Sequence, residues 1–523
     1  MQTRLSPLMH GWFCLLSLAA CNSITGLNDF SVGTGNTSQA QCMTNADCMG
    51  EGVDVLGEGG AGSGGDGMAI CVKASGACVQ VQSAECKTIT GDVTDDRAIL
   101  FGSLFSTSGA TGTTNQQRQQ AAQLAVQQIN AVGGIPTPTG NPRKLVMVSC
   151  DEAAGVTKAA EHLVKDLRVA AIVGPNTSQD TIDVTNKVSV NGGTVVISPT
   201  AVASSITSLV DNDLTWLMVP TDVQRAPLMI QNINELETQL KDARSVSTIK
   251  LGVIYRNDAL GEGTRTSIND LTLNGKPIAD PINLGKNLQI SPYDVKAANQ
   301  ADIIAKYVAF APDIIVLAGT AEAVTAVMVP LEAQWTAPSR PYYVVIDSTK
   351  TPDLITAVTN NDDLRRRVRG TGVTPGPTST PVNNNFKISY ATAYPGMTAS
   401  ASGTGPAYDA TFAVAFAFAA TRETMPNGAA IAKGLRKLAG GATHLEVGGT
   451  TALQAFQKLA AGESIDAVGT FGPLAWDANG AIQGGTIEMW CIGGSTATPA
   501  YQSAGTTFDI ATQKISGQYT PCP

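Results

Sequence analysis

The chain has 523 residues, of which 43% are hydrophobic, which is enough to bury the cores of two or three domains. Its 34 Lys and Arg residues against 43 Asp and Glu residues give a formal net charge of −9. This acidic balance argues against nucleic acid or an anionic lipid surface as the main partner. The most apolar stretch after the N-terminus, 410–420, is too short to span a membrane and predicts a buried core helix.

The first twenty residues have the pattern of an export signal. Arg4 precedes a brief apolar run that ends in Leu18-Ala19-Ala20-Cys21. A cationic start, a short hydrophobic segment and a small-small-Cys site are typical of a bacterial lipoprotein signal peptide, while an ordinary signal peptide or a buried helix is the alternative. We predict a signal peptide at 1–20, lipidation of Cys21 and a polar tether at 21–41. The chain would then lie on the periplasmic side of a bacterial membrane, and Asn22 is compatible with the outer membrane.

The remaining cysteines predict disulfides, because an exported chain with an even number of them is normally oxidised. Five of the eight lie between 42 and 86, so at least one pairs outside that cluster, and we expect Cys86 to pair with Cys150 and Cys491 with Cys522. A metal site is the alternative, but paired C-x2-C spacing and a nearby histidine are both missing, so no metal is expected. The other candidates are Cys42, Cys48, Cys71 and Cys78.

Residues 42–96 form a module rich in Cys and Gly. Its run 57–65 (GEGGAGSGG) matches the G-x-G-x-x-G pattern twice. A dinucleotide loop must follow a buried strand and open a helix, and neither flanks this run. The run therefore predicts a loop, and we expect no cofactor.

From residue 98 onward, strand-like runs alternate with helical periodicity, which predicts parallel sheets covered on both faces. The predicted strands are 98–105, 144–149, 169–173, 194–198, 214–219, 249–255, 313–319 and 342–346. The predicted helices are 115–132, 155–168, 178–190, 261–271, 320–333, 407–421 and 429–438. An Asn-Gly turn near the end of 471–480 indicates a hairpin. The basic run 365–369 predicts a solvated helix face, with a docking patch as the alternative.

Five segments in register resemble the type I periplasmic binding proteins, particularly the branch that binds leucine, isoleucine and valine. Together they span about three-quarters of the chain. The segments are 125–135 (AVQQINAVGGI), 172–178 (IVGPNTS), 196–199 (VISP), 405–410 (GPAYDA) and 471–480 (FGPLAWDANG).

The resemblance implies an α/β, two-lobed clamshell in which each lobe is a doubly wound, mainly parallel sheet with helices on both faces. The chain would cross the hinge three times, and a small ligand would bind between the lobes at the carboxyl ends of the strands. We expect lobe 1 at 97–220 and 350–470, and lobe 2 at 221–349 and 471–523.

The same resemblance implies the ligand-binding residues of lobe 1. Ser178 opens a helix whose N-terminus favours an anion. The matching serine in related proteins helps to hold a ligand carboxylate, and a helix-capping serine is the alternative. The stretch that contains Ser198, Thr200 and Val202 would add contacts, although Val202 cannot form the side-chain hydrogen bond of the Thr usual there. The loop that begins at Ser106 and ends at Thr114 would supply further ligand contacts.

On lobe 2, the resemblance implies contacts from Leu260 and Thr320, where relatives often carry aromatic residues. Asp347, which ends the strand 342–346, lies roughly where an acidic residue accepts the ammonium group of the ligand. A turn or helix-capping aspartate is the alternative for Asp347.

These patterns favour a lipid-anchored solute-binding protein that captures an amino acid or similar carboxylate for an ABC permease. No P-loop, nucleophile elbow or metalloprotease motif is present, so no enzyme is expected. A membrane-tethered sensor or scaffold with the same fold is the alternative.

Overall fold

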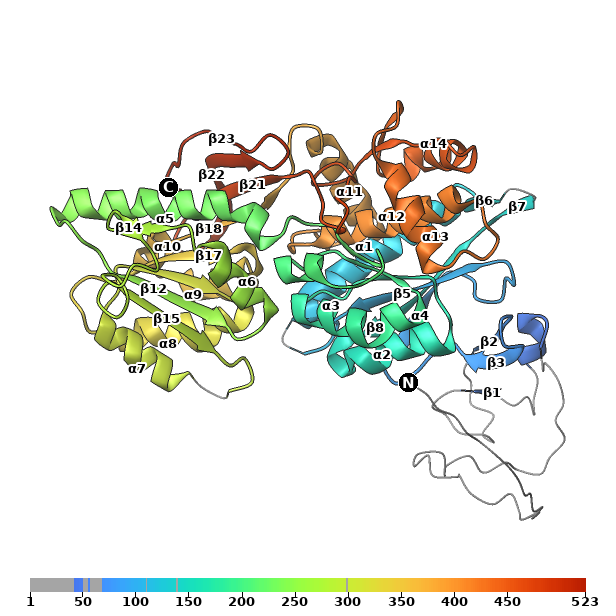
Figure 1. Cartoon of the computed structure of the whole chain (residues 1–523), viewed down its shortest axis with the longest axis horizontal. Coiled ribbons are helices and arrows are strands. Elements are labelled where there is room, and N and C mark those ends of the chain that lie inside the picture. Colours follow the sequence, from blue (N-terminus) through green and yellow to red (C-terminus); the bar gives the residue numbers. More distant parts are fainter. Residues whose placement is uncertain (1–41, 50–54, 57–67, 110, 138–139, 298–299) are drawn as a thin grey trace, which may run out of the picture.

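A computed structural model describes residues 42–49, 55–56, 68–109, 111–137, 140–297 and 300–523 (Figure 1). The predicted signal peptide at 1–20, the tether at 21–41 with Cys21, and the glycine-rich run 57–65 lie outside these residues. Within the described residues, no helix is both long enough and apolar enough to cross a membrane.

Two α/β lobes lie side by side, and the chain runs between them three times (Figure 1). The lobe 1 sheet has the order β11-β10-β9-β5-β8-β4 and is parallel except for the antiparallel edge strand β4. The bounds are β4 (Cys86–Thr90), β5 (Ile99–Phe105), β8 (Leu145–Asp151), β9 (Ala171–Val173), β10 (Val195–Ser198) and β11 (Thr215–Leu217).

Helices cover both faces of this sheet because its strands are apolar on both sides. The helices of one face are α1 (Gly112–Ala131), α11 (Thr380–Ala393), α12 (Thr404–Thr421), α13 (Gly428–Leu435) and α14 (Gly449–Ala460). Those of the other face are α2 (Val156–Glu161), α3 (Ser178–Val184) and α4 (Val190–Gly192), with π-helical turns at His162–Asp166 and Thr185–Ser189. Residues 404–419 of α12 are all buried, so the predicted core helix is confirmed.

The lobe 2 sheet has the order β15-β12-β16-β17-β18-β21-β22-β23. Its first five strands are parallel, and the last three extend the sheet with antiparallel pairs. The strands are β12 (Leu251–Arg256), β15 (Leu288–Tyr293), β16 (Ile314–Ala318), β17 (Tyr342–Ile346), β18 (Val368–Thr374), β21 (Thr486–Gly494), β22 (Pro499–Asp509) and β23 (Lys514–Ser516).

Six helices surround this second sheet. The face that carries α5 and α6 has one apolar cluster, and the face that carries the other four has another. Their bounds are α5 (Asp222–Arg244), α6 (Ala259–Ser267), α7 (Ala301–Phe310), α8 (Val329–Gln334), α9 (Pro352–Val358) and α10 (Asp362–Arg367). Three small two-stranded pairs complete the lobes: β6 (Ile135–Thr137) with β7 (Gly140–Arg143), β13 (Thr272–Leu273) with β14 (Lys276–Pro277), and β19 (His444–Glu446) with β20 (Asp466–Val468).

Two of the expected lobe boundaries are wrong. Residues 352–374 belong to lobe 2, because β18 pairs with β17 in parallel register. Residues 471–483 stay with lobe 1, because the Trp476 indole N–H donates to the Leu217 carbonyl and the Leu217 N–H donates to the Gly480 carbonyl. The predicted hairpin turn is confirmed by the antiparallel bridge between Trp476 and Ile482.

The cysteine module is a three-stranded sheet against lobe 1, with the order β1-β3-β2. Its strands are β1 (Val55–Leu56), β2 (Ala69–Val72) and β3 (Ala77–Gln80), and they follow a 3-10 turn at Asn45–Cys48. Ile70 and Val79 join the apolar cluster on the α2 face of lobe 1. The module is shorter than the predicted range 42–96, because β4 (residues 86–90) belongs to the lobe 1 sheet.

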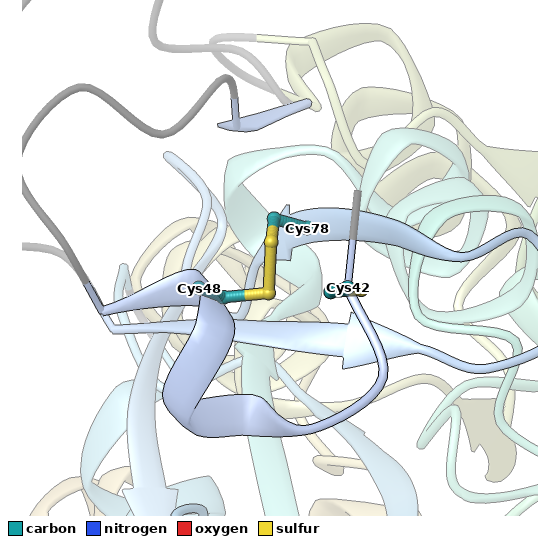
Figure 2. A group of neighbouring side chains, drawn as sticks. All are labelled: Cys42, Cys48 and Cys78. Carbon is teal, nitrogen blue, oxygen red and sulfur yellow. A yellow bond between two sulfur atoms is a disulfide. The ribbon is translucent and has the colours of Figure 1, made fainter. Parts of the chain in front are cut away.

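Four disulfides join all eight cysteines of the described chain. The predicted Cys86–Cys150 and Cys491–Cys522 pairs are confirmed. The module holds Cys42–Cys71 and Cys48–Cys78. Figure 2 shows why three of these sulfurs cluster: the Cys48–Cys78 bond lies beside Cys42. All three are oxidised, so none offers the thiolate that a metal site needs.

The prediction that the basic run 365–369 is a solvated helix face is wrong. Arg365, Arg367 and Arg369 are buried, and only Arg366 is largely exposed. Arg367 donates to both carboxylate oxygens of Glu332, at 2.9 and 2.7 Å. These arginines therefore anchor the start of β18 in lobe 2 rather than offering a docking surface.

Candidate functional site

A cavity of about 280 Å³ lies between the lobes. Lobe 1 contributes Arg118 from α1 and Thr200 from the loop after β10. Lobe 2 contributes Arg225 from α5 and Asp347 from the end of β17. Since strands of parallel sheets present their carboxyl ends to such a crevice, this is where a ligand of this fold is expected.

Arg118 is the central cation of the lobe 1 wall. Its Nε donates to the Ser402 carbonyl at 2.8 Å, and its Nη1 donates to Asn115 Oδ1 at 2.7 Å. Burial lowers the pKa of Arg118 to about 10, although the carboxylates Glu152 and Asp347 oppose this shift. The guanidinium therefore remains charged at neutral pH and is held in one orientation toward the cavity.

A buried polar network supports Arg118 from behind. Asn176 donates its side-chain N–H to the same Asn115 oxygen at 2.7 Å and its backbone N–H to Glu152 at 3.1 Å. Ser106 donates to the other oxygen of Glu152 at 2.7 Å. Burial, reinforced by the charge of Asp180, raises the pKa of Glu152 to about 8. Glu152 therefore holds its proton more readily than an ordinary glutamate, which weakens its compensation of the Arg118 charge.

The lobe 2 wall carries two ion pairs. Arg225 Nη1 donates to Asp347 Oδ1 at 2.8 Å, and both side chains are mostly buried. Lys350 Nζ lies 3.7 Å from Glu488 Oε1 and also over the Trp490 ring, 5.7 Å from its centroid. Each anion that lines the cavity thus faces a cation of the same chain.

The third wall comes from α11 and from the lobe 1 segment after β20. Phe386 and Phe471 line the cavity with apolar surface, and the exposed Lys387 lies beside them. Within the described residues, Lys387 has no ion-pair partner, whereas Asp347 and Glu488 are both paired. Four cationic side chains therefore face two anionic ones, and the cavity has an excess of positive charge suited to an anion.

The structure brings only part of the predicted site into this cavity. Thr200 and Asp347 line it from opposite lobes, as a shared binding site requires. Thr200 donates to the Asn176 carbonyl at 2.6 Å, and Ser106 is one contact further back, on Glu152. Asp347 is already bonded to Arg225 rather than free for a ligand ammonium group.

Ser178, Ser198 and Val202 are buried and hold the lobe 1 loops together. Ser178 Oγ accepts the backbone N–H groups of Val202 and Ala203, each at 3.1 Å. Ser198 donates to the Pro175 carbonyl at 2.5 Å. Val202 lines a space of only about 20 Å³ that shares Arg225 and Asp347 with the cavity and has room for a water molecule, not for an amino acid. A ligand contact for these three residues stays a prediction.

The last three predicted residues lie away from the cavity lining. Leu260 packs against the apolar cluster beneath α5 and α6. Thr320 donates to Glu322 through its hydroxyl and through its backbone N–H. Thr114 lies in the first turn of α1, four residues before Arg118.

Sequence reasoning missed Arg118, Arg225, Phe386 and Lys387. Arg118 is the only charged residue of α1, in a helix otherwise rich in Gln and Ala, and that isolation was an available signal. Arg225 lies in the first turns of α5, behind a capping box formed by Thr221 and Gln224. Nothing in the local pattern of α11 distinguishes Phe386 and Lys387 from surface positions.

Comparison with known proteins supports the architecture. The sequence model of the family described as Periplasmic binding protein matches residues 98–455. Among curated protein sequences, none matches the chain.

Solved structures with the same fold align over most of the chain. The branched-chain amino acid transporter substrate-binding protein LivJ from Streptococcus pneumoniae, in complex with isoleucine, is 18% identical and has a TM-score of 0.56, with 78% of this chain and 99% of that chain covered. The leucine-binding protein LivK from Thermotoga maritima is 13% identical and has a TM-score of 0.56, covering 77% and 98%. A solute-binding protein of an ABC transporter from Rhodopseudomonas palustris, in complex with 3,4-dihydroxybenzoic acid, is 13% identical with a TM-score of 0.56, covering 82% and 98%.

Proposed function

Because the chain belongs to the periplasmic binding protein family, we propose that it is an extracytoplasmic solute-binding protein that captures an amino acid or a similar small carboxylate for an ABC-type uptake system. The observation that supports this most directly is the cavity between the lobes, which carries an excess of positive charge. Proteins of this family bind substrates rather than transform them, so no reaction is assigned to the cavity.

Clamshell closure would provide the mechanism. Arg118 and Thr200 would hold the ligand on lobe 1, and Arg225 and the residues around Asp347 would meet it from lobe 2. A ligand that contacts both lobes stabilises the closed arrangement over the open one by its difference in affinity for the two. A permease that recognises the closed form would then accept only loaded protein.

The N-terminal sequence supports a lipid anchor at Cys21, with the lobes on the periplasmic side of a bacterial membrane. Mass spectrometry of the mature N-terminus tests this part separately: a diacylated Cys21 is expected, and an unmodified residue there would contradict it.

Thermal unfolding in the presence of candidate ligands tests the binding role. The panel comprises amino acids, small carboxylates and their amides, added to exported protein with its four disulfides formed. A ligand at 100 times its dissociation constant stabilises the folded protein by about 2.7 kcal/mol, which is readily seen as a raised midpoint. If no member of the panel raises the midpoint, the solute-binding proposal fails and a tethered sensor or scaffold becomes the better interpretation.

A further inference from the structure

We propose that the interlobe cavity takes a small organic acid that has a carboxylate but no ammonium group. This inference rests on the proposed solute-binding function and narrows its ligand class. Three features of the cavity carry it: a held cation on lobe 1, the internal pairing of both lining anions, and the excess of positive charge that results.

The carboxylate would bind Arg118. Two of its nitrogens are fixed by Ser402 and Asn115, while Nη2 donates no hydrogen bond within the described residues. A guanidinium held in this way loses little side-chain entropy when it bonds a carboxylate, and charge-assisted bonds of this kind are strong. Lys387 adds a second positive charge to the same cavity.

The Ser178 hydroxyl that the family resemblance implies as a carboxylate ligand is only 2% exposed and lies outside the cavity lining. The hydroxyl oxygen of Ser178 already accepts hydrogen bonds from the backbone N–H groups of Val202 and Ala203. A ligand carboxylate would have to break both bonds to reach these donors. Arg118 therefore replaces the helix terminus as the anion-binding group.

An ammonium group would find no free carboxylate. Asp347 is bonded to Arg225 at 2.8 Å in a largely buried pair, and Glu488 faces Lys350. The charge of each lining anion is already balanced, and Arg118 and Lys387 add two further positive charges, so a ligand ammonium group would enter a cavity of net positive charge. An acid without the amino group meets no such penalty.

Part of the ligand would meet apolar surface. Phe386 and Phe471 line the cavity together with Val219, Pro375 and Pro406. These side chains offer carbon surface, while Ser348, Asn383 and Ser400 offer hydrogen-bond donors in other parts of the lining. The volume of about 280 Å³ limits the ligand to a small molecule.

Matched pairs of ligands that differ only in the amino group test the inference. The pairs are isoleucine with 3-methylpentanoate and phenylalanine with 3-phenylpropanoate, measured at pH 7 by titration calorimetry and thermal unfolding. We expect the dissociation constant of at least one acid to be lower than that of its amino acid by about tenfold or more. Arg118→Ala should weaken acid binding about ten- to a hundredfold. Arg366→Ala, which removes an exposed arginine of α10, is the matched control and should leave it unchanged.

Arg225→Ala provides a second test, independent of whether Arg118→Ala folds. It frees Asp347, so the preference for the acid should shrink or reverse. Amino acids that bind wild-type protein as tightly as the acids would overturn the inference and leave the solute-binding function standing. If neither variant changes the binding of the acids, the binding site lies elsewhere, and this result would also overturn the inference. If no ligand in the panel binds, both proposals fail.

Discussion

The substitution Ser178→Ala separates a structural role of this residue from a ligand-binding role. Ser178 is only 2% exposed, and its Oγ accepts two buried backbone N–H groups, from Val202 and Ala203. Alanine cannot accept either bond. Each buried donor left unpaired costs about 1–3 kcal/mol, so the loss of both bonds should lower the free energy of unfolding by about 2–6 kcal/mol. This loss is expected without any ligand present.

Urea unfolding of the exported protein measures the loss, and amide hydrogen exchange locates it. The Val202 and Ala203 amides should exchange faster in Ser178→Ala, because their acceptor is gone. Ser205→Ala is the control, since Ser205 is an exposed residue of the neighbouring 3-10 turn and should change stability by less than about 0.5 kcal/mol.

The opposite result would refute this reasoning. If Ser178→Ala changes unfolding by less than about 0.5 kcal/mol and leaves both amides protected, its hydroxyl does not hold the loop. If the same variant also abolishes ligand binding, Ser178 faces the ligand as the resemblance implies. The argument that Arg118, and not the N-terminus of α3, binds the ligand carboxylate would then fail.

Three further predictions concern stability. Replacing Cys86 and Cys150 together by Ser opens a loop with a sequence separation of 64 and should lower the free energy of urea unfolding by about 4 kcal/mol, and an unchanged midpoint would contradict this. Gly403→Ala places a Cβ against Thr200 Cγ2 at a φ of +84° and should lower the thermal midpoint by the equivalent of about 1–3 kcal/mol. Burial raises the pKa of Asp409 to about 7 from an ordinary 3.8. Between these two values the folded protein keeps a proton on Asp409 that the unfolded chain releases. The free energy of unfolding should therefore fall as the pH rises from about 4 to 7. Asp409→Asn should lack this loss, so its stability relative to wild type should improve between pH 5 and pH 8; a difference independent of pH would contradict the assignment.

The alternation of strands and helices could be predicted from sequence because each parallel strand is buried on both faces. The runs at β10 and β17 are continuously apolar, and the structure forms strands there with nearly the predicted bounds. The same logic failed at the C-terminal end of the chain. Strands β22 and β23 carry exposed residues along their length and pair in antiparallel register, so they lack the apolar run that marks a central strand.

Lobe membership was harder to predict because it depends on pairing between distant segments. β18 begins within a run of arginines, a pattern that indicates a solvated helix when read locally. In the folded chain, Glu332 pairs with Arg367 from a helix more than thirty residues earlier. The buried charge is tolerated because its partner is buried with it, and no local window contains both.

The side-chain partners in the binding site also depend on segments that are distant in the sequence. The backbone positions of Thr200 and Asp347 follow from strand ends, so sequence reasoning could place both at the crevice. Which partner each side chain takes is decided across the fold, where Arg225 reaches Asp347 over a separation of 122 residues. A carboxylate expected to meet a ligand ammonium is thereby neutralised before any ligand arrives. Under the ligand class proposed above, the charge pattern of the cleft, and not the fold alone, selects the ligand.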